Sequence, residues 1–126
     1  MRILIADDHV AVRKGVCEIL KNGFSDLTCD EATNGQDAIR LATVNPPDLI
    51  ILDVNMPIMG GFEAAIAIKR RLPSVPILFF TMHTGDGIAV EARKVGMDGY
   101  ITKVEAGETL VKAVNALLKG QEHFPA

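Results

Sequence analysis

The 126-residue sequence contains no tryptophan, one tyrosine and five phenylalanines, so aromatic residues amount to only 5%. Its core must therefore consist mainly of aliphatic side chains, which are plentiful, since hydrophobic residues make up 48% of the chain. No apolar run approaches the ~20 residues that a membrane-spanning helix needs, and Met1-Arg2 leads straight into a strand-like run without a signal peptide. We expect a cytoplasmic protein with no membrane partner.

The chain also lacks an excess of positive charge and has little cysteine. Its 13 Lys and Arg against 16 Asp and Glu give a net charge of -3. A domain that grips nucleic acid needs a basic face, so we expect no direct nucleic-acid binding. Cys17 and Cys29 are isolated in the sequence, without a Cys-x-x-Cys pair, which predicts two reduced, buried thiols.

One apolar run, Leu49-Ile50-Ile51-Leu52, ends on the carboxylate of Asp53. The run is continuous and does not alternate with polar residues, which predicts a strand buried on both faces of a helix-covered parallel sheet. Ligand chemistry in such sheets collects at the carboxyl ends of the strands. Asp53 therefore stands where a reactive carboxylate is expected.

Strand-like and helix-like segments alternate along the rest of the chain. Apolar residues recur with helical spacing from Val12 to Leu20, for example, and proline or Asn-Gly pairs stand between segments. In the helix that Pro73 closes, we expect Phe62, Ala65 and Ile66 to face inward. Strands are expected at residues 2–6, 27–32, 49–53, 76–81 and 99–102.

Five strands alternating with five helices predict an α/β fold with a single doubly wound parallel sheet, because the connections must be right-handed crossovers. The second strand is the most polar and belongs at an edge, which gives the order 2-1-3-4-5. This flavodoxin-like order also occurs in the chemotaxis regulator CheY, and its ligand lies between the first and third strands. We expect residues 1–126 to form one domain.

Polar residues follow four of these strands. Asp7 and Asp8 come after the first, Asp53 after the third, Thr81 ends the fourth, and Lys103 follows the fifth. Carboxylates this close repel one another and would take up protons unless a positive charge compensates them. Two or three carboxylates suit Mg²⁺, which keeps several waters, better than a full calcium cage.

This set of groups fits phosphoryl transfer. A carboxylate beside Mg²⁺ and a lysine can attack phosphorus and form an acyl phosphate. The metal and the Lys103 ammonium offset charge on the transferring oxygens, and the Thr81 hydroxyl can bind one of them. Each residue alone is better explained as a turn, a cap or a solvated end. Their shared position at the ends of strands in one sheet favours the joint functional interpretation.

The chain resembles the receiver domain of two-component response regulators over essentially all 126 residues. Two stretches resemble one branch of this family, the NarL/FixJ-like regulators, whose members carry a C-terminal LuxR-type helix-turn-helix. These stretches are Asp7-Asp8-His9 with the following Val12–Val16, and the closing Leu118-Lys119-Gly120-x-x-x-Phe124. The matching stretches are Ile5-Ala6-Asp7-Asp8-His9, Glu31-Ala32-x-Asn34-Gly35, Leu52-Asp53-Val54-Asn55-Met56-Pro57, Phe80-Thr81 and Gly99-Tyr100-Ile101-Thr102-Lys103.

The resemblance implies a role for each matching residue. Asp53 would accept a phosphoryl group from the phosphohistidine of a sensor histidine kinase. Asp8, Asp53 and the backbone carbonyl of Asn55 would hold Mg²⁺, and Asp7 would act through a water. Lys103 would pair with Asp53 or with its phosphate.

It also implies a switch and an output. Thr81 and Tyr100 would form the switch pair, with Thr81 drawn to the phosphate and Tyr100 rotating inward. Asn55 and His83 lie two residues beyond Asp53 and Thr81, so we expect both to tune the lifetime of the phosphate. The domain would be a signalling module that catalyses only its own phosphorylation and dephosphorylation. It would form a homodimer in some states and control transcription through a DNA-binding domain that this chain does not contain.

Two positions carry further expectations. Val104 follows Lys103 where the family usually has proline, which leaves the geometry of that peptide bond open. His9 is expected to be a helix-start or core-rim residue and not a metal ligand.

Three other functions compete with this one. A phosphohydrolase of the haloacid dehalogenase type also uses Mg²⁺ and an aspartate nucleophile, but it needs Asp-x-Asp, whereas Asn55 stands at the second position here. A flavin carrier needs a phosphate loop after the first strand, where Asp7 and Asp8 would repel phosphate. A phosphorylation-independent interaction module would normally lack one of the site residues, and none is missing.

Overall fold

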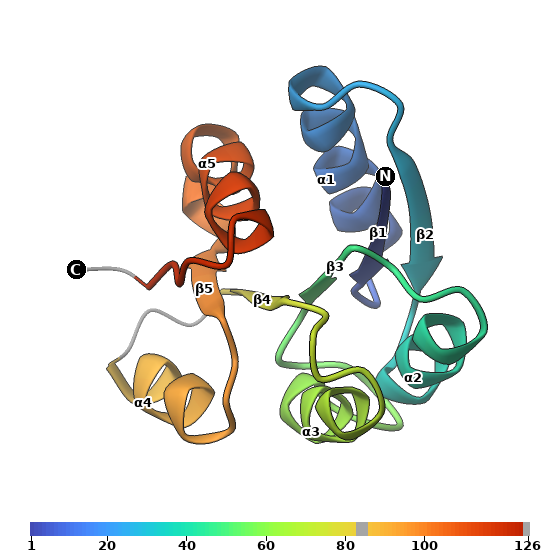
Figure 1. Ribbon diagram of the computed structural model, residues 1–126, viewed down its shortest axis with the longest axis vertical. Helices are drawn as coiled ribbons and strands as arrows, with labels where there is room; N and C mark the ends of the chain where they lie inside the picture. The colour runs from blue at the N-terminus through green and yellow to red at the C-terminus, as the bar shows by residue number, and fades with distance from the viewer. Residues whose placement is uncertain (83–85, 125–126) are drawn as a thin grey trace.

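The computed structural model describes residues 1–82 and 86–124. Within them, five strands form one parallel sheet in the order β2-β1-β3-β4-β5, which confirms the predicted topology (Figure 1). Strand β2 is an edge strand, as its polar sequence predicts. The strands are β1 (Arg2–Ala6), β2 (Thr28–Ala32), β3 (Leu49–Leu52), β4 (Ile77–Thr81) and β5 (Gly99–Thr102).

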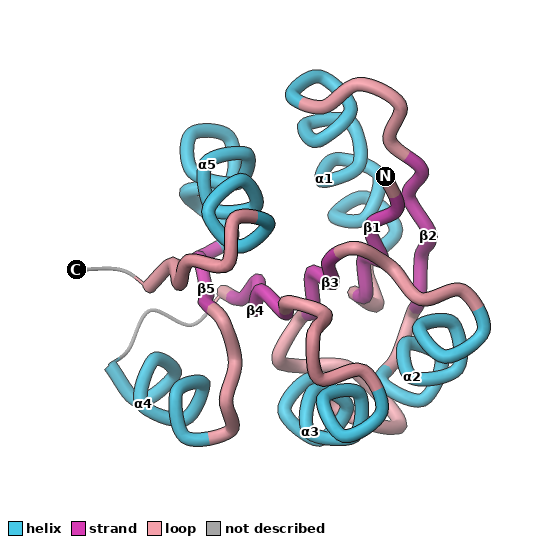
Figure 2. Tube along the Cα trace, viewed as in Figure 1, coloured by secondary structure: helices cyan, strands magenta, loops and turns pink. Residues whose placement is uncertain are grey.

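Helices cover both faces of this sheet. Figure 2 shows α1 and α5 on one side and α2, α3 and α4 on the other. A short 3-10 turn, η1 (Lys103–Glu105), joins β5 to the last helix. The helices are α1 (Val10–Gly23), α2 (Gly35–Val44), α3 (Gly61–Arg71), α4 (Asp86–Lys94) and α5 (Ala106–Leu118). None of the helices in the described ranges is long and apolar enough to cross a membrane.

The continuous apolar run of β3 is explained by two separate cores. Leu49 and Ile51 pack with residues of α1 and α5, whereas Ile50 and Leu52 pack with residues of α2, α3 and α4. Both faces of the strand are therefore buried, and all four residues are at most 1% exposed. Such a strand does not need polar residues at alternate positions, because neither of its faces contacts water.

The expectation for the inward face of α3 is wrong at one residue. Ile66 is 37% exposed, whereas Gly61, Ala64, Ala65 and Ile68 are buried. The buried positions follow the i, i+3, i+4, i+7 spacing of one helix face. Ile66 lies one residue beyond Ala65, about 100° further round the helix, and so turns away from the sheet.

The turn from β3 to α3 is built closely against the carboxyl end of β3. A Cβ on Gly61 would lie 2.1 Å from the backbone oxygen of Asp53, so only glycine lets α3 begin so near that residue. The Gly61 N–H donates to the Val54 oxygen at 2.9 Å. Further along, the Lys103–Val104 peptide bond, left open by the sequence, is trans.

The two cysteines are not isolated in space. Cys17 on α1 and Cys29 on β2 are both partly buried and pack against the core beneath α1. Burial, and then the hydrogen bond and charge of the neighbouring Cys17, raise the pKa of the Cys29 thiol to about 12. The contact between the thiols could not be predicted from spacing, because it depends on how α1 lies on β2.

We expect Cys29 to react slowly with iodoacetamide in the folded protein. At about pH 8 a thiol with this pKa holds roughly a thousandth of the thiolate of an ordinary cysteine, and the thiolate is the nucleophile. Peptide mass mapping after timed labelling measures the rate. Cys17→Ala, which removes one cause of the shift, should speed labelling of Cys29. Equal rates in folded and urea-unfolded protein would contradict the contact.

Candidate functional site

The parallel strands bring the predicted polar residues to one edge of the sheet. Ala6 pairs with Leu52 in the β1–β3 register, so Asp7 and Asp53 leave the sheet side by side. The Asp53 N–H donates to the Ala6 oxygen at 2.9 Å. Thr81 pairs with Thr102 in the β4–β5 register, so the next residue, Lys103, begins at the same edge.

Three of these side chains form a buried ion cluster. The Lys103 ammonium lies 2.7 Å from Asp7 Oδ2 and donates a hydrogen bond to Asp53 Oδ2 at 3.2 Å. The side chains of Lys103, Asp7 and Asp53 are only 11%, 2% and 5% exposed. Two carboxylates thus share one ammonium, which leaves one negative charge uncompensated in a poorly solvated place.

The imbalance changes the acidity of these groups. Burial and then the charge of Asp7 raise the pKa of the Asp53 carboxyl, against the opposing effect of Lys103. Burial alone would lower the pKa of Lys103, but its contact with Asp7 and the charges of both carboxylates raise it overall. The fold therefore holds a cluster with one excess negative charge at the carboxyl edge of the sheet.

The loop after β1 places two more polar side chains, those of Asp8 and His9, beside Asp7. The His9 N–H donates to Asp7 Oδ1 at 2.9 Å, and His9 Nδ1 lies 3.2 Å from Asp7 Oδ1 and 3.3 Å from Asp8 Oδ1. Ligand atoms of these three residues lie within 4.8 Å of one another. His9 is also the N-cap residue of α1, as expected for a helix-start residue, and its side chain is 67% exposed.

A buried oxygen tests whether a cation fits here. Among residues 1–82 and 86–124, Asp7 Oδ2 is a buried side-chain oxygen that accepts no hydrogen bond of good geometry. Lys103 compensates its charge, but the lone pairs are not saturated. Carboxylate oxygens in this state, with Asp8 exposed beside them, suit a hard divalent cation that keeps several waters.

Asn55 and Thr81 lie at the same edge of the sheet as the cluster, whereas Tyr100 lies two residues before the end of β5. The Asn55 N–H donates to Asp53 Oδ1 at 3.3 Å, and Thr81 is completely buried. Tyr100 is only 5% exposed, so its ring already points inward and no inward rotation is needed from this conformation. His83 lies outside the described residues.

Comparison with known proteins identifies the family of this chain. A family model described as the response regulator receiver domain matches residues 3–115. This chain belongs to that family. The receiver domain is similar to the transcriptional activator protein ExaE of Pseudomonas putida, with 32% identity over 98% of this chain and 58% of ExaE. It is 36% identical to the nitrate/nitrite response regulator protein NarL of Escherichia coli, over 94% of this chain and 55% of NarL.

A solved structure supports the same branch. The receiver domain superimposes on a LuxR-family two-component response regulator from Aurantimonas sp. SI85-9A1 with a TM-score of 0.90 and 34% identity, covering 97% of this chain and 87% of that one. The domain spans somewhat more than half the length of the curated relatives it matches. NarL and the Aurantimonas protein are named as response regulators, and none of these matches is a haloacid dehalogenase.

Sequence reasoning missed Arg13, which fixes the first loop of the receiver domain. Its Nη1 donates to the Asp7 oxygen at 2.8 Å, and its Nε donates to Glu31 Oε1 at 2.8 Å. A hydrogen bond from Lys14, together with Arg13 and against the effect of burial, lowers the pKa of Glu31. No local sequence signal marks Arg13, because both contacts depend on how α1 lies beside β1 and β2.

Exposed apolar side chains surround the acidic edge and were also missed. Val10, Ile58, Met82 and Val104 are all more than half exposed, and each lies in a loop or first turn that begins at the carboxyl end of a strand. Ile58 adopts a φ of 69°, a left-handed conformation that is unfavourable for a β-branched residue. Nothing in the local sequence predicts that these four residues share one rim.

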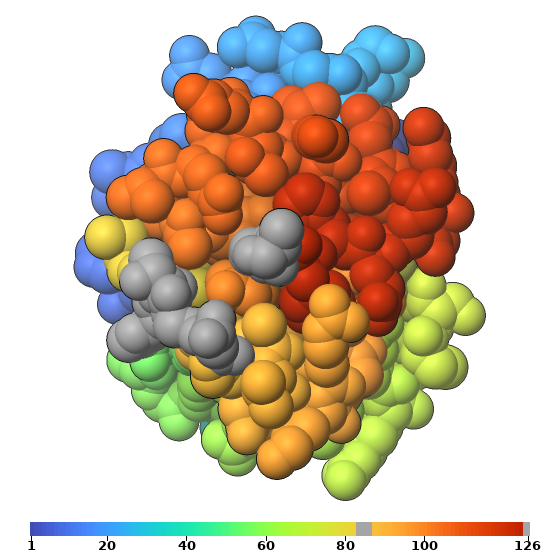
Figure 3. All heavy atoms as spheres, turned by 90° about the vertical axis from the view of Figure 1, so that its left-hand side faces the viewer, coloured from blue at the N-terminus to red at the C-terminus, as the bar shows by residue number. Residues whose placement is uncertain are grey.

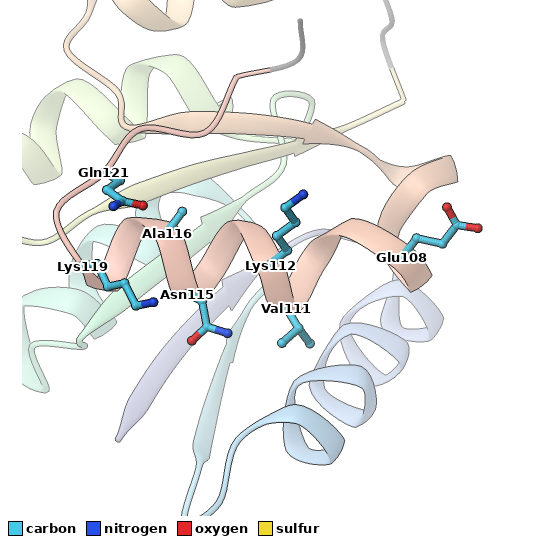
Figure 4. Close-up of a pocket in the computed structure, with 7 residues that line it drawn as sticks. All are labelled: Glu108, Val111, Lys112, Asn115, Ala116, Lys119 and Gln121. Carbon is cyan, nitrogen blue, oxygen red and sulfur yellow. The ribbon is translucent and has the colours of Figure 1, made fainter.

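A cavity of about 550 Å³ lies elsewhere, along α5 (Figure 4). No strand-end residue lines it, so it is separate from the ion cluster. The lining residues are Glu108, Val111, Lys112, Asn115, Ala116, Lys119 and Gln121.

Proposed function

We propose that this receiver domain accepts a phosphoryl group on Asp53 from the phosphohistidine of a sensor histidine kinase. A carboxylate oxygen of Asp53 forms the new P–O bond while the P–N bond to the donor imidazole breaks, which yields an acyl phosphate. The observation that carries the proposal is the cluster of Asp53, Asp7 and Lys103, since it supplies a nucleophile next to a fixed cation.

We infer that Mg²⁺ binds beside Asp53. Asp8, Asp53 and the Asn55 carbonyl would hold it, with Asp7 acting through a water, and the unsaturated Asp7 Oδ2 supports this assignment. When bound, the ion would offset charge on the phosphoryl oxygens. Lys103 holds the Asp53 oxygen in place and then pairs with the phosphate. Asn55 and His83 would set how fast water removes the phosphate.

We further propose that Thr81 donates to a phosphoryl oxygen and that Tyr100 then keeps the buried position described above. The signal would leave through the surface of α4, β5 and α5, where a partner or a second copy of the chain could bind. ExaE is named as a transcriptional activator and NarL as a response regulator, and both are longer than this chain. The output is therefore control of transcription in the cytoplasm by a larger protein of which this domain is the input part.

The test uses acetyl phosphate as a small phosphodonor. We expect the protein to gain one phosphoryl group in the presence of Mg²⁺ and none with excess EDTA, because the cluster alone carries uncompensated negative charge. Intact-protein mass spectrometry measures the adduct. The competing phosphohydrolase function would instead give continuous phosphate release from p-nitrophenyl phosphate. Such turnover, or an equal adduct in EDTA, would contradict the proposal.

A further inference from the structure

The segment that follows α5 returns to the sheet and pairs with the free edge of β5. The His123 N–H donates to the Asp98 oxygen at 3.0 Å, and the Tyr100 N–H donates to the His123 oxygen at 3.0 Å. These bonds make a parallel bridge between Gly99 and His123. In Figure 3 the end of the described chain, drawn in red, lies between α5 and α4 on this face. Residues 121–124 are called the docked segment below.

Gly99 makes this close approach possible. A Cβ at this position would lie 2.3 Å from the His123 backbone oxygen and 3.0 Å from its carbonyl carbon. Neither atom belongs to a flexible side chain that could move aside. Only glycine therefore allows the docked segment to stay on β5, which is one reason for a glycine inside a strand.

Phe124 connects the docked segment to two other elements. Its ring packs edge-on against Tyr100, with centroids 6.3 Å apart and planes at 68°. On the α4 side, Arg93 Cζ lies 4.0 Å from the centre of the Phe124 ring. Arg93 also reaches Glu122 Oε1 at 3.4 Å. The segment thus rests on the residue proposed as the switch aromatic and on the helix beside it.

We propose that the docked segment is the part of the chain that responds to phosphorylation, through the position of Tyr100. This inference rests on the proposed function. Tyr100 in its buried position packs its ring against Phe124, so a rotation of the Tyr100 ring away from this position would break that contact. Because Thr81 moving to the phosphate favours the inward ring, phosphorylation favours docking. Coupling is reciprocal, so docking must equally favour the phosphorylated state.

The experiment measures both directions of this coupling in the full 126-residue chain. Beryllofluoride with Mg²⁺ mimics the phosphoryl group, and amide exchange of Tyr100 and His123 reports the two bridge hydrogen bonds. We expect beryllofluoride to slow both exchanges about fivefold or more. Phe124→Ala should speed both and weaken beryllofluoride binding about fivefold. Val44→Ala, which removes an exposed apolar side chain from α2, is the matched control and should change neither.

Gly99→Ala gives an independent variant, since its Cβ displaces His123 without touching Phe124; it should reproduce the effect of Phe124→Ala. The fluorine NMR signal of bound beryllofluoride separates the possible failures. If beryllofluoride binds but Phe124→Ala binds it as the parent does, the coupling is wrong and the proposed function stands. If the Tyr100 and His123 amides exchange freely in the parent, docking itself is wrong. If no beryllofluoride binds, the proposed function fails and this inference with it.

Discussion

Asp53→Asn is expected to stabilise the metal-free protein at neutral pH while abolishing its phosphorylation. The substitution removes one of two buried carboxylates that share Lys103, so the cluster loses its uncompensated charge. The amide keeps the shape of the side chain and cannot form an acyl phosphate. We expect a gain on the order of 1 kcal/mol in the free energy of unfolding, because the lost attraction to Lys103 offsets most of the relieved repulsion, which is about 4 kcal/mol for two unit charges roughly 4 Å apart near a protein surface.

The gain should depend on pH in a defined direction. The folded-state pKa of Asp53 lies above its ordinary value of 3.8, so the parent binds a proton there more readily when folded. The stabilising effect of protonated Asp53 is complete below the unfolded pKa and is lost as the pH rises through the folded pKa. Asp53→Asn should therefore match the parent in acid and exceed it at neutral pH.

Urea titrations in EDTA at several pH values measure this difference. Glu18→Gln removes the same charge from an exposed position on α1 and serves as the control for net charge. We expect it to change stability little at any pH. An Asp53→Asn variant that is less stable than the parent at neutral pH would show that the cluster is not under electrostatic strain.

Lys103→Met should have the opposite effect on stability. The methionine keeps most of the aliphatic stem, but the loss of the ammonium leaves Asp7 and Asp53 buried without a cation. Removing one partner of a buried ion pair typically costs about 3 kcal/mol or more. We expect a loss of about 3 kcal/mol in EDTA at neutral pH, and partial recovery with Mg²⁺, because the metal replaces the missing positive charge.

The control for this variant is Lys112→Met, since Lys112 is exposed on α5. The same urea titrations, with and without Mg²⁺, give both comparisons. Equal stability of Lys103→Met and the parent would mean that Lys103 does not compensate the carboxylates. A loss that Mg²⁺ leaves unchanged would place the metal away from the cluster.

Much of the fold could be predicted because single segments carry enough information. The unbroken apolar run of β3 requires two covered faces and the polar β2 belongs at an edge. With right-handed crossover connections, these features favour the observed strand order. Parallel strands then bring Asp7, Asp53 and Lys103 to one edge without any knowledge of side-chain positions. This is why the candidate site could be assembled from the sequence.

What could not be predicted depends on contacts between distant segments. The contact between the free thiols of Cys17 and Cys29 requires the position of α1 over β2, and the packing of Tyr100 against Phe124 requires the return of residues 121–124 to β5. Ile66 was misplaced because its neighbour Ala65 is inward and a single residue step turns the side chain out. Arg13 is not itself a residue of the ion cluster; it acts by holding the loop after β1 through its bond to the Asp7 oxygen.

The central claim is that Asp53 is the phosphoryl acceptor, and trapping the acyl phosphate tests it most directly. Borohydride reduces a phosphorylated aspartate to homoserine, which marks the modified residue permanently. The protein would be treated with acetyl phosphate and Mg²⁺, reduced, digested and mapped by peptide mass spectrometry. The account predicts homoserine at position 53 alone, and none in Asp53→Asn. Homoserine at Asp7 or Asp8, or a phosphoryl group that borohydride does not remove, would contradict it.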